Sequence, residues 1–170
     1  QQVELEISEL FPNFRVNRLD YDTTRGKNSF NKIISSFERN EFDILIGTQM
    51  VTKGLDFKNV KLVGVLNVDN SLNFPDFRAY ERCYQLIQQV AGRSGRSLER
   101  GKVLIQTFNS SNDIFQQIIA NDYESMFNSQ IEEREKFKYP PLYKLIKITV
   151  KHKSFELVNK STDWLAKNLS

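Results

Sequence analysis

The residues best suited to chemistry lie in one short run, Gln89-Val90-Ala91-Gly92-Arg93-Ser94-Gly95-Arg96. If the helical pattern before this run continues through it, Gln89, Arg93 and Arg96 fall at positions i, i+4 and i+7 and share one face. Guanidinium groups donate paired hydrogen bonds to phosphate oxygens and stay charged at any relevant pH. Gly92 lacks a side chain, so another group can approach its backbone closely. The run predicts a clamp for a polyanion. The alternative is a helix C-terminus ended by glycines, with arginines complementing its dipole.

A second run, Gly47-Thr48-Gln49-Met50-Val51-Thr52-Lys53-Gly54-Leu55-Asp56-Phe57, leaves the end of an apolar segment and turns sharply. Thr48 and Gln49 are placed to donate hydrogen bonds to a phosphate from the tip of a strand. Gly54 permits a tight turn, and Asp56 is a short acceptor suited to a sugar hydroxyl. The alternative is a plain strand-turn-helix joint in which Thr48 caps the helix and Asp56 is a turn residue.

Strand and helix patterns alternate along the chain, which predicts an α/β layer fold with a mostly parallel sheet. We expect strands at residues 15–20, 43–48, 61–66 and 102–107, and helices at 2–11, about 23–39, 77–91, 112–121, 123–138 and 155–169. The apolar run 43–48 is typical of a strand buried on both faces. Asp22 or a neighbouring threonine is placed to cap the helix that ends near Arg39. Ligands gather at the carboxyl ends of such strands, where the second run begins.

Two of the expected helices carry an apolar face at helical spacing. In the helix 77–91 these residues are Phe77, Tyr80, Tyr84, Ile87 and Ala91, and in the helix before Arg39 they are Phe30, Ile33, Ile34 and Phe37.

Tyr139-Pro140-Pro141 ends the helical pattern at 123–138, because consecutive prolines stop a helix and stiffen a connector. We therefore place a domain boundary near Pro140, with one domain at 1–139 and the start of another, truncated one at 140–170. Residues 142–150 alternate loosely like a strand. The segment beyond Pro141 is rich in lysine, which fits DNA phosphates and a plain solubilising surface equally well. The chain begins in a helical pattern without a Met and ends just after apolar residues, so we expect a piece of a longer protein.

Composition excludes several classes. With 39% hydrophobic and 26% charged residues, the 170-residue chain is typical of a globular domain, and a net charge of +3 does not by itself indicate a nucleic-acid partner. No apolar run is long enough to cross a bilayer. The single Cys83 is expected to pack in a core, in a reducing cytosolic setting, and the single His152 to lie on the surface. We expect Glu132 and Glu133 to lie on a solvent-exposed face of a helix. Arg25-Gly26-Lys27-Asn28-Ser29 lacks the first glycine and the Ser or Thr of a phosphate-binding loop.

Together the two runs resemble motifs V and VI of the superfamily 2 helicases, in which Q-x-x-G-R-x-G-R closes the second of two RecA-like lobes. Within that superfamily the chain resembles the PriA-type replication-restart DNA helicases. This closer likeness rests on Gly47 to Met50, Lys53 to Phe57, Leu72 to Ala79, Glu81-Arg82 and Gln89 to Arg96, with weaker support from Arg18 to Thr23 and Lys138 to Pro141. It spans most of residues 1–150.

The resemblance implies the second RecA-like lobe of an ATP-driven 3′→5′ DNA helicase, followed by part of a small α+β C-terminal domain. Arg93 and Arg96 would reach the γ-phosphate, and Gln89 would position that phosphate or the attacking water. Asp56 would contact the ribose beside Gly54 and Gly92. Thr48 and Gln49, with Lys53, would contact a DNA phosphate. The resemblance also implies ATP and Mg²⁺ as cofactors, forked or single-stranded DNA as substrate, and primosome proteins and single-stranded-DNA-binding protein as partners, in the bacterial cytoplasm at the nucleoid.

Some parts that the resemblance implies are expected elsewhere. The nucleotide-binding loop and the metal-holding acid would belong to a first lobe, and the family's paired-cysteine zinc module would lie upstream of Gln1. We therefore expect this piece alone to hydrolyse no ATP and to bind no zinc. Two alternatives remain: another superfamily 2 motor of the RecG or RecQ kind, and a non-catalytic single-strand-binding module that kept only the fold.

Overall fold

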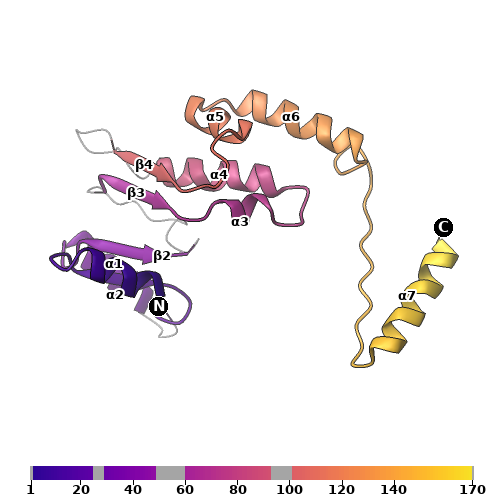
Figure 1. Ribbon diagram of the computed structural model, residues 1–170, viewed down its shortest axis with the longest axis horizontal. Helices are drawn as coiled ribbons and strands as arrows, with labels where there is room; N and C mark the ends of the chain where they lie inside the picture. Colours follow the sequence, from indigo (N-terminus) through magenta and orange to yellow (C-terminus); the bar gives the residue numbers. More distant parts are fainter. Residues whose placement is uncertain (1, 25–28, 49–59, 93–100, 170) are drawn as a thin grey trace. The chain divides into compact units, whose positions relative to one another are not determined.

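The computed structural model describes residues 2–24, 29–48, 60–92 and 101–169. The chain forms two compact units, Gln1–Gln130 and Ile131–Ser170. Its elements are α1 (Gln2–Leu10), β1 (Val16–Leu19), α2 (Ser29–Glu38), β2 (Ile44–Gly47), β3 (Leu62–Val65), α3 (Asp69–Leu72), α4 (Ala79–Ala91), β4 (Lys102–Ile105), α5 (Asp113–Ala120), α6 (Tyr123–Lys136) and α7 (Phe155–Leu169) (Figure 1). This alternation confirms the predicted α/β class.

Strands β1 and β2 pair in parallel, with Val16 opposite Ile44 and Leu19 opposite Gly47. Ahead of both strands, Arg15 donates from Nε to Asp43 Oδ2 at 3.0 Å and from Nη2 to Asp43 Oδ1 at 3.0 Å. This two-pronged contact joins residues far apart in the chain and helps to set the register of the pair. The predicted apolar face of α2 is confirmed, since its four members all belong to the small core around Leu19: Phe30, Ile33, Ile34 and Phe37.

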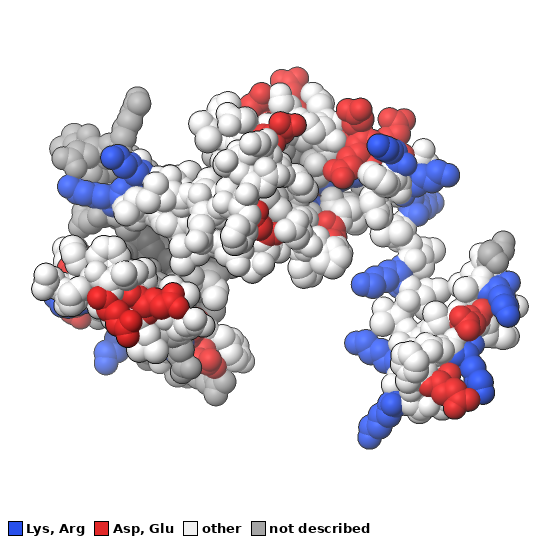
Figure 2. Space-filling view, viewed as in Figure 1, with Lys and Arg blue, Asp and Glu red and all other residues white. Residues whose placement is uncertain are grey.

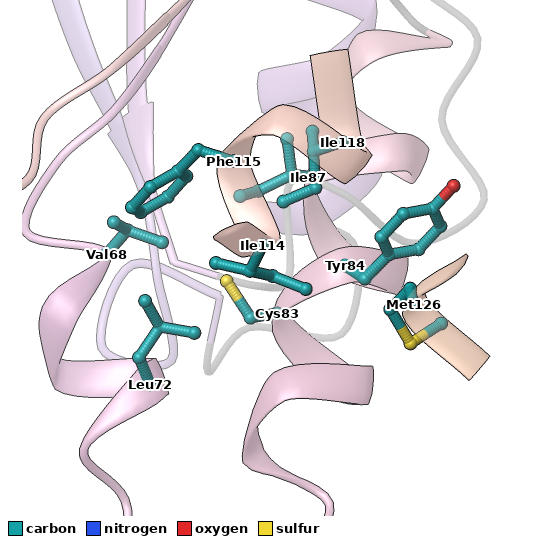
Figure 3. Packing of buried hydrophobic residues seen from close by; sticks show 9 residues of the cluster. All are labelled: Val68, Leu72, Cys83, Tyr84, Ile87, Ile114, Phe115, Ile118 and Met126. Carbon is teal, nitrogen blue, oxygen red and sulfur yellow. The ribbon is translucent and has the colours of Figure 1, made fainter. Parts of the chain in front are cut away.

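Strands β3 and β4 also pair in parallel, with Leu62 opposite Lys102 and Val65 opposite Ile105. Helix α4 contacts both strands, and α5 packs on α4 (Figure 1). Between these elements lies the main core, which is drawn in Figure 3. Its buried members are Val68, Leu72, Cys83, Tyr84, Ile87, Ile114, Phe115, Ile118 and Met126. Most come from α4 and α5, in which the apolar residues recur at helical spacing, and together they hold α4 in place.

The expectation that the strand at 43–48 is buried on both faces was wrong. No residue of β2 is fully buried, and β3 and β4 each alternate between exposed and half-buried positions. Val65 and Ile105 pack against the main core, whereas Leu62 is 57% and Leu104 60% exposed on the other face. An apolar run shows that a strand could be buried on both faces. It is buried there only where other elements of the fold pack against each face.

The residues expected to cap α2 have another role in the described structure. Helix α2 is described from Ser29 on, and Asp22 and the two threonines lie in a turn before it. The Thr23 hydroxyl accepts a hydrogen bond from Asp20 N at 2.9 Å, and the Thr24 hydroxyl donates to Asp20 O at 2.7 Å. These side chains close a turn after β1 instead, a role that hydroxyls fill as readily as a helix cap. Residues 25–28 of the rejected phosphate loop lie outside the described residues.

The second unit contains the end of α6, an extended segment and α7. The strand predicted at 142–150 is not there, because no strand in the described part of the chain pairs with this segment. Helix α7 matches its prediction, and His152, Glu132 and Glu133 are exposed as expected. Lysine side chains stand along the segment and α7 (Figure 2).

The two units divide within α6, whereas the boundary predicted near Pro140 follows that helix. The predicted boundary therefore remains a prediction. In the described part of the chain, none of the helices has the length and apolar character needed to span a membrane.

Candidate functional site

Helix α4 presents Gln89 to solvent. Ile87 and Val90 are buried on either side of it, and they fix the rotation of the helix about its axis. The amide of Gln88 donates to the carbonyl oxygen of Ile118 in α5 at 3.1 Å, which ties the same turn to the neighbouring helix. Gln89 is exposed, and within the described residues its amide makes no hydrogen bond. A well-anchored helix thus holds an unengaged amide at its last turn.

Helix α4 ends at Ala91, with Gly92 as its C-cap at φ −64° and ψ −10°. The premise that the helix continues through Arg93 was therefore wrong, and α4 does not supply the shared face predicted for Gln89, Arg93 and Arg96. Both arginines lie outside the described residues. A Cβ added at Gly92 would lie 3.4 Å from the carbonyl oxygen of Gln88, an ordinary contact. Neither the conformation nor its described neighbours require a glycine at 92, so its role in admitting a ligand remains a prediction.

The carboxyl end of the β1–β2 pair carries hydroxyl groups. Thr48 follows β2 directly and is exposed, as the DNA-contact prediction requires. The turn after β1 contributes Thr23, whose backbone N–H donates to the Asp20 carboxylate at 3.0 Å. That hydrogen bond, with a further contribution from the Arg18 guanidinium, lowers the pKa of Asp20. Asp20 is thus engaged in shaping the turn, while Thr48 stays open to a ligand.

The described residues include some members of each predicted group of site residues. Thr48 belongs to the DNA-contacting group, and Gln89 with Gly92 to the nucleotide-contacting group. The other predicted site residues lie outside the described residues, and their roles remain predictions: Gln49, Lys53, Gly54, Asp56, Arg93 and Arg96.

Sequence reasoning missed a polar clamp at the carboxyl end of the β3–β4 pair. Asp69 accepts hydrogen bonds from the Thr107 hydroxyl at 2.9 Å and from the backbone N–H of Phe108 at 3.0 Å. The carboxylate therefore joins the first turn of α3 to the segment after β4. The rule that parallel strands gather ligands at this edge points to the right place, but no local motif marks Asp69. Both carboxylate oxygens are already used, so the clamp positions backbone.

The described residues contain no cluster of three or more His, Cys, Asp or Glu side chains suited to a metal ion. Cys83, the single cysteine, is completely buried in the main core, as predicted. Burial and the nearby charge of Asp69 raise the pKa of its thiol to about 11, so at neutral pH it stays protonated. Cys83 is a packing residue.

Comparison of the sequence with known proteins identifies a family to which the chain is similar. Residues 1–98 match the model of the helicase conserved C-terminal domain. Replication restart protein PriA of Bacillus subtilis is 45% identical over 152 residues, which are 89% of this chain and 19% of that protein. PriA of Synechocystis is 42% identical over 146 residues, 86% of this chain and 18% of that protein. PriA of Borreliella burgdorferi is 34% identical over 177 residues, 99% of this chain and 26% of that protein.

The chain thus spans about a fifth of the length of the relatives it matches. The region that matches the family model includes the β1–β2 pair, β3 and the exposed Gln89 at the end of α4. The chain belongs to the helicase conserved C-terminal domain family, as an α/β helicase lobe similar over most of its length to replication restart protein PriA.

Proposed function

We propose that this chain is the second RecA-like lobe of an ATP-dependent 3′→5′ DNA helicase that restarts replication at stalled or repaired forks. Its substrates would be ATP and forked or single-stranded DNA. By resemblance, primosome proteins and single-stranded-DNA-binding protein would be its partners in the bacterial cytoplasm. The single observation that carries the proposal is Gln89, which is exposed and unengaged at the end of a helix locked into the core, directly before the arginine run.

In this proposal Arg93 and Arg96 bind the γ-phosphate of ATP held by the first lobe, and Gln89 orients that phosphate or the attacking water. Asp56 hydrogen-bonds the ribose, with Gly54 and Gly92 leaving room for the nucleotide. Bound Mg²⁺ would offset phosphate charge, and its ligands would come from the first lobe. The arginines stabilise charge that develops during transfer, which in related enzymes is worth about 10³–10⁵ in rate.

Thr48, Gln49 and Lys53 would hold the DNA backbone. When the arginines draw the two lobes together, these groups would shift along the strand, and hydrolysis would release them. The exposed position of Thr48 at the carboxyl end of β2 supports this role, because a hydroxyl there is open to a phosphate.

The test is Arg93→Ala and Arg96→Ala in the complete protein that contains this chain. Each variant should lose ATP turnover by about 10³-fold or more and lose unwinding, while DNA affinity stays within a few-fold. Arg39→Ala is the matched control, because Arg39 is an exposed arginine already paired with Glu41 at 2.7 Å. Turnover that survives in both arginine variants would refute the assigned role.

Two further measurements separate the alternatives. DNA-stimulated ATPase in the complete protein distinguishes a motor from a non-catalytic binding module, and a preference for forked over plain duplex DNA distinguishes restart from other superfamily 2 activities. The isolated chain should neither hydrolyse ATP nor bind zinc, since the proposal assigns both sites to other parts of the parent protein. Measurable turnover by the isolated chain would overturn that expectation.

A further inference from the structure

The segment between α3 and α4 is stiffened by one carboxylate. Asp76 accepts a hydrogen bond from the backbone N–H of Arg78 at 2.9 Å, and its carbonyl oxygen accepts from Ala79 N at 2.9 Å. The same side chain pairs with the guanidinium of Arg82, one turn into α4, at 3.1 Å. Asp76 therefore orders the backbone just before α4 and fixes Arg78, the N-cap residue of that helix.

The side chain of Arg78 is held without being neutralised. Its guanidinium carbon lies 5.0 Å from the centre of the Phe77 ring, a cation–π contact. Among the described residues no carboxylate lies within ion-pairing distance of Arg78, and the residue is exposed. A contact with the ring face does not use the N–H donors of the guanidinium, and because Arg78 is exposed these donors can bind a further partner.

Arg82, in the first turn of α4, differs from Arg78, because it already forms an ion pair with the Asp76 carboxylate. Phe74, two residues before Asp76, leaves 59% of its surface exposed. The segment thus offers solvent an oriented, unpaired cation and an open aromatic ring. Phosphate and base are the two chemical groups of a nucleic acid that this pair fits.

The place of Arg78 in the fold separates it from the arginine run. Helix α4 has 13 residues, and Arg78 precedes its first turn while Gln89 lies in its last. At a rise of about 1.5 Å per residue, the two ends are roughly 17 Å apart. The first turn is fixed by a hydrogen bond from Asn112, the N-cap of α5, to the Tyr80 hydroxyl at 3.1 Å. A contact made by Arg78 is therefore distinct from one made by Gln89.

We propose that Arg78, stacked on Phe77, binds a phosphate of single-stranded DNA, with Phe74 as a neighbouring surface for a base. The inference rests on the proposed function, since it assumes that the lobe contacts DNA. It adds a second DNA contact besides the one proposed for Thr48, Gln49 and Lys53. Helix α4 then joins a nucleotide-binding end to a DNA-binding end through one rigid element.

The test measures binding of the complete protein to single-stranded oligonucleotides at several salt concentrations, without nucleotide. Arg78→Ala should weaken binding about five- to tenfold for every sequence and lower the slope of log affinity against log salt by about 0.7, the value for one lost phosphate contact. Arg78→Lys, which keeps the charge but loses the planar fork, should fall between wild type and Arg78→Ala. Phe77→Leu tests the stacking and should weaken binding two- to threefold, a rough estimate for an exposed cation–π contact.

Arg39→Ala, which removes the same charge from a paired arginine, should leave both affinity and salt slope unchanged. Wild-type affinity and slope in Arg78→Ala would refute the proposal. So would unchanged DNA binding together with weaker binding of an acidic peptide, which would assign Arg78 to a protein partner. ATPase without DNA should stay at the wild-type level in Arg78→Ala. Loss of ATPase in the Arg93 and Arg96 variants tests the proposed function separately.

Discussion

The two compact units contain similar apolar residues but bury them very differently. In the first unit, side chains from α3, α4, α5 and α6 meet in one core, and Ile87 is only 1% exposed. In the described part of the second unit, residues 131–169, no side chain is fully buried. Ile146 is 85% exposed there, and Trp164 in α7 is 64% exposed. Apolar residues at helical or strand spacing therefore do not by themselves produce a core.

The difference lies in what each element has to pack against. Helix α4 lies between a strand pair and α5, so its apolar face is covered from two directions. Helix α7 also has an apolar face, including Trp164 and Leu165, but none of its residues is buried, and these two side chains line a hollow together with Val150 of the extended segment. Stability should thus be concentrated around α4, the element that carries Gln89.

The largest expected effect is a direct comparison of two isoleucines. Ile87→Ala should lower the free energy of unfolding by about 2–5 kcal/mol, because it opens a cavity in a filled core. Ile146→Ala removes the same atoms from an exposed site and should change it by less than about 0.5 kcal/mol. Urea unfolding followed by far-UV circular dichroism measures both. Equal losses in the two variants would mean that the second unit has a core of its own.

A second test uses the reactivity of cysteine thiols to compare burial in the two units. Cys83 is buried and the pKa of its thiol is raised to about 11, so at pH 8 very little reactive thiolate is present. A cysteine introduced by Ser161→Cys, at an exposed site in α7, should react with a disulfide reagent about a hundredfold faster or more. In urea the two rates should converge. Fast native labelling of Cys83 would show that the core opens readily.

Local patterns in the sequence account for much of this structure. The apolar face of α4 was predicted almost correctly because helical spacing is a property of neighbouring residues, and Ile87 and Tyr84 are buried as expected. The expected helix 77–91 ends where α4 ends, at Ala91. Its continuation through Gly92, on which the shared face of Gln89, Arg93 and Arg96 depends, is not found, because Gly92 is the C-cap.

Interactions between distant residues account for the rest. The strand predicted at 142–150 failed because a strand needs a paired neighbour, which a local pattern cannot supply. The Asp69 clamp was missed for the same reason, since Thr107 lies 38 residues later in the chain. For the candidate site, Gln89 and Thr48 are exposed, and their roles in binding nucleotide and DNA remain predictions. The roles of Arg93 and Arg96 remain predictions.

The Asp69 clamp gives a third and smaller test. Asp69→Ala removes hydrogen bonds to the Thr107 hydroxyl and to the backbone of Phe108, and should cost about 1–3 kcal/mol of unfolding free energy. Asp163→Ala, at an exposed position in α7, is the matched control and should cost less than about 0.5 kcal/mol. A cost for Asp69→Ala no larger than that of the control would show that the clamp does not hold the β3–β4 end together.

The smallest expected effect is on pH dependence and concerns the ion pair before β1 and β2. The side-chain hydrogen bonds from Arg15, its backbone N–H and its charge lower the pKa of Asp43 from 3.8 to about 2. Because the pKa of Asp43 is lower in the folded chain than in the unfolded chain, the pair stabilises the fold fully above about pH 4. That contribution is lost as the pH falls through about 2. Carboxyl resonances followed by NMR from pH 6 to pH 1.5 should show Asp43 titrating last, with Arg15→Ala returning it toward 3.8.

The Lys160–Glu156 pair in the second unit is the natural comparison, since its 2.8 Å separation is even shorter than the 3.0 Å of the Arg15–Asp43 pair. It joins residues four apart on one helix, where the backbone already holds both partners close. Arg15 and Asp43 instead join the starts of two strands, so breaking that pair should loosen the β1–β2 register as well as remove a charge contact. Amide hydrogen exchange at pH 2.5 should therefore rise at Val16 and Ile44 in Arg15→Ala, while Lys160→Ala leaves α7 exchange unchanged. If amide exchange at β1 and β2 is unchanged in Arg15→Ala, the register is fixed by the small core around Leu19 alone.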